Sequence, residues 1–70
     1  MEAFLDTLRI AFDRACRIRG RDVPELDMYE DAGRPVVRVT FGERFVAYAV
    51  HRRDRDTVDS IVQNSLVWSK

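Results

Sequence analysis

Cys16 and His51 have side chains that often serve as nucleophile and general base in enzymes, and each is the only residue of its type in this chain. A nucleophile needs a base and an orienting group within hydrogen-bond reach. Asp54 and Asp56 follow His51 closely, but Cys16 falls on the apolar side of a predicted helix, where cysteine behaves as a small core residue. We therefore expect no catalytic residues and predict that the protein is not an enzyme.

No residue pattern in the sequence indicates a cofactor. The three glycines are isolated from one another, whereas phosphate-binding loops need several glycines in a short motif. One cysteine and one histidine do not make a zinc-type ligand cluster. We expect no cofactor and no bound metal.

Arginines near the start of the last predicted helix could bind phosphate groups. Arg52, Arg53 and Arg55 form a basic run, interrupted by Asp54 and followed by Asp56. The carboxylates would repel phosphate, and the formal net charge of the chain is zero. These three arginines are the alternative, nucleic-acid-binding site.

Four residues of the central segment are candidates for binding a protein: Asp27, Tyr29, Arg38 and Phe45. Aromatic residues and arginine are enriched at the centres of protein interfaces. The four residues can act together only if the strands that carry them place them on one face of a sheet.

Residues 36–50 predict a β-hairpin, because two runs of β-branched and aromatic residues flank Gly42-Glu43. Glycine at the first position of a two-residue loop suits a type II′ turn, which needs a positive φ there. This loop places Val39 opposite Val46, on one strongly apolar face.

Residues 25–30 alternate polar and apolar side chains, as a half-buried strand does. A loop at residues 31–34 then sets Met28 opposite Val37, which adds Met28 to the same apolar face. Two separate turns thus predict one core face. The opposite face carries three cross-strand rows: Tyr29–Val36–Ala49, Asp27–Arg38–Ala47 and Glu25–Thr40–Phe45.

Helices are predicted on either side of the strands. Residues 2–19 have an apolar arc at helical spacing, and Gly20 is a suitable C-terminal cap. A last helix begins after Asp54 or Asp56, and the sequence leaves open whether Val67-Trp68 ends it or forms a docking tail. The first arc consists of Phe4, Leu5, Leu8, Ala11, Phe12, Ala15, Cys16 and Ile18. The second consists of Val58, Ile61, Val62, Ser65 and Leu66.

The element order α-β-β-β-α favours a single α+β domain over residues 1–70. Each helix has one apolar stripe, and the three-stranded antiparallel meander has one strongly apolar face. We predict a two-layer sandwich with both helices packed on that face. The other face of the sheet is then open to solvent or to a partner.

The element order and the chain length resemble the double-stranded RNA-binding domain. In that family a basic run at the start of the last helix meets phosphates across the major groove. Arg52, Arg53 and Arg55 stand at the matching place, so the resemblance implies a nucleic-acid binder. Where the family carries Gly-Pro followed by His, this chain has Gly33-Arg34-Pro35.

Composition favours a globular protein that acts through its surface. The chain has 70 residues, of which 46% are hydrophobic and 34% charged, enough for one modest core. No apolar run approaches the roughly 20 residues that span a bilayer, so we expect a soluble, cytoplasmic protein without a membrane partner. Lys70 is the one lysine against eleven arginines, which is typical of GC-rich coding sequence and favours a bacterial or phage origin.

From these observations we expect a small non-enzymatic protein-binding module. It would dock a larger host protein or complex through its open sheet face, or through an acidic strand edge that consists of Glu25, Asp27, Glu30 and Asp31. By size and composition it is similar to inhibitors and regulators carried by phages and mobile elements. A homodimer, and a sheet face that is merely solvated, are alternatives that the sequence leaves open.

Overall fold

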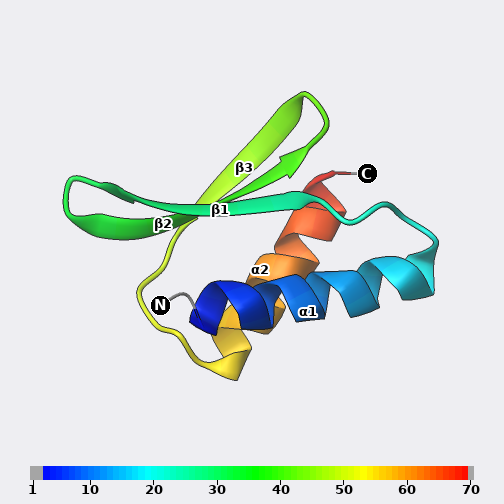
Figure 1. Ribbon diagram of the computed structural model, residues 1–70, viewed down its shortest axis with the longest axis horizontal. Helices are drawn as coiled ribbons and strands as arrows, with labels where there is room; N and C mark the ends of the chain where they lie inside the picture. Colours follow the sequence, from blue (N-terminus) through cyan, green and yellow to red (C-terminus); the bar gives the residue numbers. More distant parts are fainter. Residues whose placement is uncertain (1–2, 70) are drawn as a thin grey trace.

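The computed structural model describes residues 3–69 of the chain and confirms the predicted order of elements. The helices are α1 (Ala3–Arg19) and α2 (Arg55–Trp68). The strands are β1 (Glu25–Asp31), β2 (Arg34–Phe41) and β3 (Arg44–Ala49). The predicted start of the first helix at residue 2 lies outside the described residues. Figure 1 shows the sheet above and the two helices below, with α2 crossing α1.

The sheet is antiparallel with the strand order β1-β2-β3, and its register is the predicted one. Met28 pairs with Val37, and Val37 pairs with Tyr48. Gly42 has φ +64, as the predicted type II′ turn requires.

The turn between β1 and β2 is tighter than the predicted four-residue loop. Asp31 and Arg34 pair with each other, so that only Ala32 and Gly33 make the turn. Both turn residues have positive φ, +53 and +80, which is the signature of a type I′ turn. That turn follows the right-handed twist of the two strands, and this preference outweighs the poor fit of alanine to positive φ.

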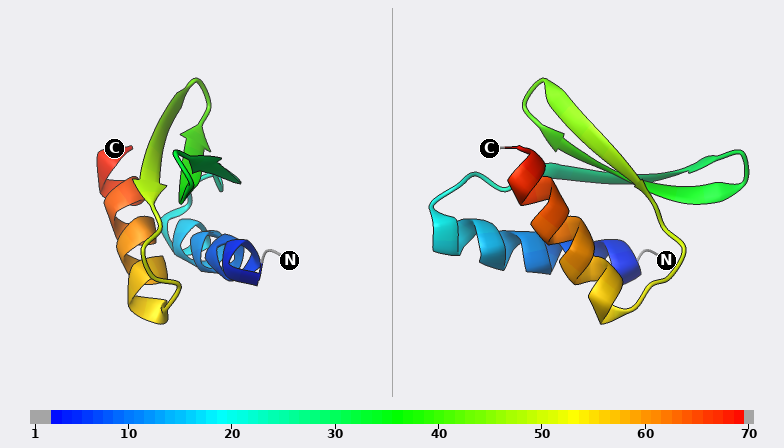
Figure 2. Two further views of the ribbon diagram at one scale, coloured as in Figure 1. Left: turned by 90° about the vertical axis from the view of Figure 1, so that its left-hand side faces the viewer. Right: turned by 180° about the vertical axis from the view of Figure 1, so that it is seen from behind.

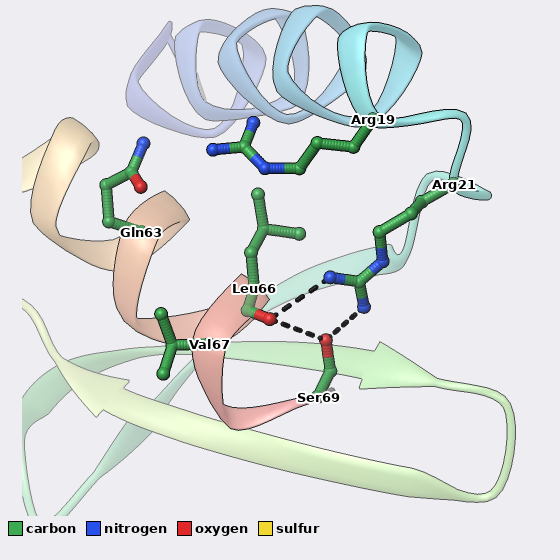
Figure 3. A pocket seen from close by; sticks show the side chains of 6 residues that line it. All are labelled: Arg19, Arg21, Gln63, Leu66, Val67 and Ser69. Atoms are coloured by element: carbon green, nitrogen blue, oxygen red, sulfur yellow. Dashed lines mark hydrogen bonds between the residues drawn. The ribbon is translucent and has the colours of Figure 1, made fainter.

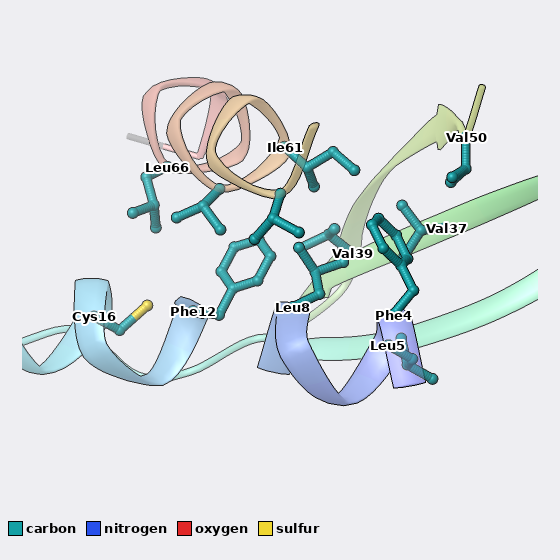
Figure 4. Close-up of a cluster of buried hydrophobic side chains, with 12 residues drawn as sticks. Phe4, Leu5, Leu8, Phe12, Cys16, Val37, Val39, Val50, Ile61 and Leu66 are labelled. Carbon is teal, nitrogen blue, oxygen red and sulfur yellow. The ribbon is translucent and has the colours of Figure 1, made fainter. Parts of the chain in front are cut away.

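The core lies between the helices and one face of the sheet, as predicted (Figures 1 and 4). Leu8, Phe12, Val37 and Val39 have no exposed surface. Further core residues are Phe4, Leu5, Cys16, Val50, Val58, Ile61, Val62 and Leu66. Ser65, also fully buried, donates a hydrogen bond to Tyr48 Oη at 3.0 Å, so its small side chain lets α2 approach β3.

One residue of the predicted apolar arc is misplaced. Ile18 is 84% exposed, because it lies in the last turn of α1, which projects past α2 (Figure 1). The helix ends at the predicted glycine: Gly20 has φ +65, and its N–H donates to the Arg17 carbonyl. The Arg21 N–H donates to the Cys16 carbonyl at 2.9 Å, which completes a Schellman cap.

The alanine at positive φ generates a stability prediction. Ala32→Asn should stabilise the fold by about 0.5–1 kcal/mol, because asparagine followed by glycine suits a type I′ turn and alanine is strained there. Thermal unfolding followed by circular dichroism should show a midpoint a few degrees higher. The matched control is Ala47→Asn on β3, where φ is not positive and asparagine has no conformational advantage over alanine. A variant Ala32→Asn no more stable than the parent chain would contradict this account of the turn.

Candidate protein-binding face of the sheet

The four predicted protein-binding residues come together on the face of the sheet that points away from the helices. Asp27 and Tyr29 belong to β1, Arg38 to β2 and Phe45 to β3. Asp27 pairs directly with Arg38, while Tyr29 and Phe45 flank that pair diagonally, one on each outer strand. Three strands thus contribute to one cluster, which we call the Arg38 cluster.

The guanidinium of Arg38 is the centre of this cluster. It lies 5.3 Å from the ring centroid of Tyr29 and 5.8 Å from that of Phe45. Its Nη2 atom donates to Asp27 Oδ2 at 3.0 Å. Cation–π contacts at exposed sites contribute about 0.5–1 kcal/mol. The three contacts therefore hold a long, normally mobile side chain in one arrangement.

Both aromatic rings of the cluster remain accessible. Tyr29 is 39% exposed and Phe45 is 58% exposed, and the neighbouring Ala47 and Ala49 are exposed and too small to cover them. Val36 lies on the same face between Tyr29 and Ala49 and is buried. The face is a shallow surface with two aromatic rings and one arginine between them.

The three arginines of the alternative site lie around the N-terminal end of α2. Arg52 and Arg53 are in the segment after β3, Arg55 is the first helical residue, and all three are exposed. Arg52 Nη2 forms an ion pair with Asp54 Oδ2 at 2.7 Å. Within residues 3–69, Arg53 and Arg55 form no ion pair, so two of the three charges are available to a phosphate.

Asp54 is the residue that caps α2. Its Oδ1 accepts hydrogen bonds from Thr57 Oγ1 at 2.7 Å and from the Thr57 N–H at 2.9 Å. These bonds, with a smaller contribution from the charge of Arg52, hold the pKa of Asp54 below its ordinary value. Asp54 stays a carboxylate in the middle of the basic run.

A second arginine–aromatic cluster, not predicted from the sequence, joins the end of α2 to the β2–β3 hairpin. Arg44 lies 4.6 Å from the Trp68 ring centroid, and the Phe41 and Trp68 centroids are 6.1 Å apart. Trp68 therefore belongs to the end of α2, whereas Val67 is 64% exposed. Phe41 and Arg44 flank one turn, but Trp68 lies more than 20 residues further along the chain, so no local pattern indicates the cluster.

Arg21 is the fourth member of this group of Phe41, Arg44 and Trp68, which we call the C-terminal cluster. It also ties the chain after α1 to α2. Its guanidinium stacks on Phe41 and donates to the Leu66 carbonyl at 3.1 Å and to Ser69 Oγ (Figure 3). A hollow of about 610 Å³ opens beside it, and Arg19 borders it as well. Arg19 donates to the Ala15 carbonyl, so both guanidiniums already serve helix ends.

The structure assembles no catalytic constellation from the two reactive residues. Cys16 is fully buried in α1, and burial raises the pKa of its thiol. His51 is exposed in the segment after β3. Within residues 3–69, no group of histidine, cysteine and acidic side chains could hold a metal ion. None of the helices in this range is long and apolar enough to cross a membrane.

The hydrogen bonds of Asp54 generate a pH prediction. Because the pKa of Asp54 is lower in the folded protein than its ordinary value of 3.8, its contribution to stability is complete above that value and is lost as the pH falls through the folded pKa. Asp54→Ala should lower the stability at neutral pH, and the difference from the parent chain should shrink in acid. Urea unfolding between about pH 7 and about pH 2.5 measures both.

The matched control for this prediction is Asp56→Ala, which removes a carboxylate from the same turn but no hydrogen bond seen in the structure. A gap between the parent chain and Asp54→Ala that stays constant down to the lowest pH would show that the cap does not act through the charged carboxylate.

Comparisons of the chain with protein-family models, with curated proteins and with solved structures give no significant match.

Proposed function

We propose that this protein is a non-enzymatic protein-binding module that docks a larger protein through the open face of its sheet. The observation that carries the proposal is the Arg38 cluster: two exposed aromatic rings with a guanidinium held between them by Asp27. Aromatic residues and arginine contribute most of the binding energy in many interfaces.

The arrangement of the cluster supports binding because it is already ordered in the free chain. Immobilising a flexible side chain on association costs about 0.5–1.5 kcal/mol, and much of this cost is avoided where the side chain is held beforehand. Arg38 is held by Asp27, Tyr29 and Phe45. The exposed alanines beside the rings let a partner approach the sheet closely.

The charge of this region indicates the kind of partner. Glu25 and Asp27 lie on the open face, Glu30 and Asp31 follow on the same strand, and all four are exposed. Arg38 balances one of these charges through Asp27. We infer that the partner presents a basic surface with apolar groups that contact the rings. We further propose that this protein is an inhibitor or regulator and that its partner is a larger protein of a bacterial host.

Alanine substitutions on the open face test this proposal. Tyr29→Ala and Phe45→Ala should each weaken capture of the partner by about tenfold or more, because truncation of a central aromatic anchor costs at least 1–2 kcal/mol. Both variants should fold, since neither ring belongs to the core. Capture on immobilised protein and calorimetry with the captured partner measure the effect.

The matched control is Ile18→Ala, which removes an exposed apolar side chain from α1. Unchanged capture by both ring variants would refute docking through this face.

Nucleic-acid binding is the alternative function, and the free charges of Arg53 and Arg55 are the observation in its favour. It predicts binding to double-stranded RNA at about 50 mM salt, with affinity falling by orders of magnitude at about 200 mM. Replacing Arg52, Arg53 and Arg55 together by alanine should abolish this binding. Replacing Arg9, Arg14 and Arg17 removes the same charge from α1 and serves as the control. Absence of binding at the lower salt concentration would eliminate this alternative.

A further inference from the structure

We propose that the free edge of β1 accepts an added strand from the partner, and that this strand alternates basic and apolar residues. The inference rests on the proposed function and specifies the chemistry of its partner. It is carried by three features of β1: the direction of its backbone groups, the division of its side chains between two faces, and its charge.

Three residues of β1 point their backbone N–H and C=O groups away from β2. The Val50 N–H donates to the Pro35 carbonyl at 2.9 Å, so residue 35 directs its backbone groups toward β3. Directions alternate along a strand, so that Val36 and Arg38 bond with β1. Their partners Tyr29 and Asp27 face β2. The N–H and C=O groups of Leu26, Met28 and Glu30 consequently point outward.

These outward groups are available to another strand. Within residues 3–69, no hydrogen bond from a turn, loop, cap or side chain uses the outward groups of β1. Along the opposite edge of the sheet, α2 runs beside β3 (Figure 2), and the Ser65 hydroxyl bonds to the Tyr48 side chain. An edge strand with free N–H and C=O groups is a template for β-strand addition.

The side chains of β1 predict the pattern of the added strand. On the open face a new strand would lie beside Glu25, Asp27 and Tyr29, where lysine or arginine would find carboxylates and an aromatic ring. On the helix face it would lie beside Leu26 and Met28, which are half-buried at the margin of the core, and beside the exposed Glu30 at the turn end of the strand. Because strand side chains alternate between faces, the complementary strand carries basic residues at one parity and apolar residues at the other.

The charge of β1 excludes a second copy of β1 as the best occupant. The strand carries four carboxylates and no basic residue. Antiparallel pairing of two β1 strands about Met28 sets Glu25 opposite Asp31 twice, and like charges directly opposite destabilise a sheet. A basic strand instead gains an opposite-charge pair at each of these positions.

A synthetic probe tests the predicted pattern. The probe is a labelled, end-capped peptide of strictly alternating arginine and valine, matched to the seven residues of β1. Its control has the same composition in block order. We expect the alternating peptide to bind about tenfold more tightly in fluorescence anisotropy, because several favourable cross-strand pairs form only in the alternating order. Equal binding of the two peptides would overturn the inference.

Amide hydrogen exchange on the unmodified protein identifies the surface that binds the probe. On binding, the outward amides of Leu26, Met28 and Glu30 should exchange more slowly. Those of Asp27 and Tyr29, which already bond to β2, should change little. A bound probe that leaves the three outward amides unprotected would overturn the inference, because the contact would then involve the open face alone.

Glu30→Pro is the matching variant of the protein. Glu30 is exposed and faces Pro35, whose carbonyl bonds to Val50, so the substitution removes an outward N–H but no bond between β1 and β2. Probe binding should fall to the level of the block-order control. Glu30→Gln removes the charge, keeps the N–H, and should retain most of the binding. Binding equal to that of the parent chain in a folded Glu30→Pro protein would also overturn the inference.

The outcomes distinguish this inference from the proposed function. If Tyr29→Ala and Phe45→Ala abolish capture of the partner while the edge tests fail, the open face binds the partner without strand addition. If the edge tests succeed and both ring variants still capture the partner, binding is through the edge of β1 and the open face is not the docking surface.

Discussion

The packing of the central strand against both helices is the interaction on which the rest of the structure depends. Val37 and Val39 of β2 are fully buried, as are Leu8 and Phe12 of α1, and the cluster continues into α2. Among the three strands, β2 is the one bonded on both edges. Its burial therefore sets the positions of β1 and β3 as well. Because side chains alternate along a strand, burying residues 37 and 39 forces Arg38 onto the opposite face.

The open face of the sheet follows from the same packing of the central strand against both helices. Both apolar stripes of the helices are used on one side of the sheet, and the described chain has no third helix to cover the other side. Antiparallel sheets tolerate such an arrangement when the open face is polar. Here two of its large side chains, Tyr29 and Phe45, are instead aromatic and exposed. Neither ring belongs to the buried core, which is why we propose that they contact a partner.

Much of the fold could be predicted because its determinants are local. The alternation of residues 25–30 and the two turns set the register, and all pairings predicted from them are present. The Ala32-Gly33 turn was harder to predict, since alanine rarely adopts positive φ. The capping residue of α2 is ambiguous between Asp54 and Asp56 in the sequence, because an aspartate suits an N-cap at either position. In the structure, the hydrogen bonds from Thr57 identify Asp54 as the cap. Ile18 fits the helical period, and its exposure depends on where α2 crosses α1.

The candidate site likewise has features that could be predicted from the sequence and features that could not. The membership of the Arg38 cluster could be predicted, because each member is placed by strand register alone. The stacking of Arg38 between two rings could not, because alternation determines the face of a side chain and leaves its rotamer open. The C-terminal cluster could not be predicted at all, because the contact between Arg44 and Trp68 depends on the angle at which α2 packs. No pattern along the chain encodes that angle directly.

The two arginine–aromatic clusters have the same chemistry and different relations to the fold. The C-terminal cluster joins elements that the backbone ladder does not connect: Arg21 bonds to the Leu66 carbonyl, and Trp68 packs on Phe41. Its removal would free the end of α2, so the fold accounts for its presence. The Arg38 cluster joins strands that are already paired through their backbones, and it lies on the side of the sheet away from the core. Its contacts add side-chain interactions across strands that are already paired, but they do not attach an element that the ladder leaves free. The ordered arginine between two exposed rings, on the side of the sheet away from the core, is the arrangement on which the proposed docking role rests.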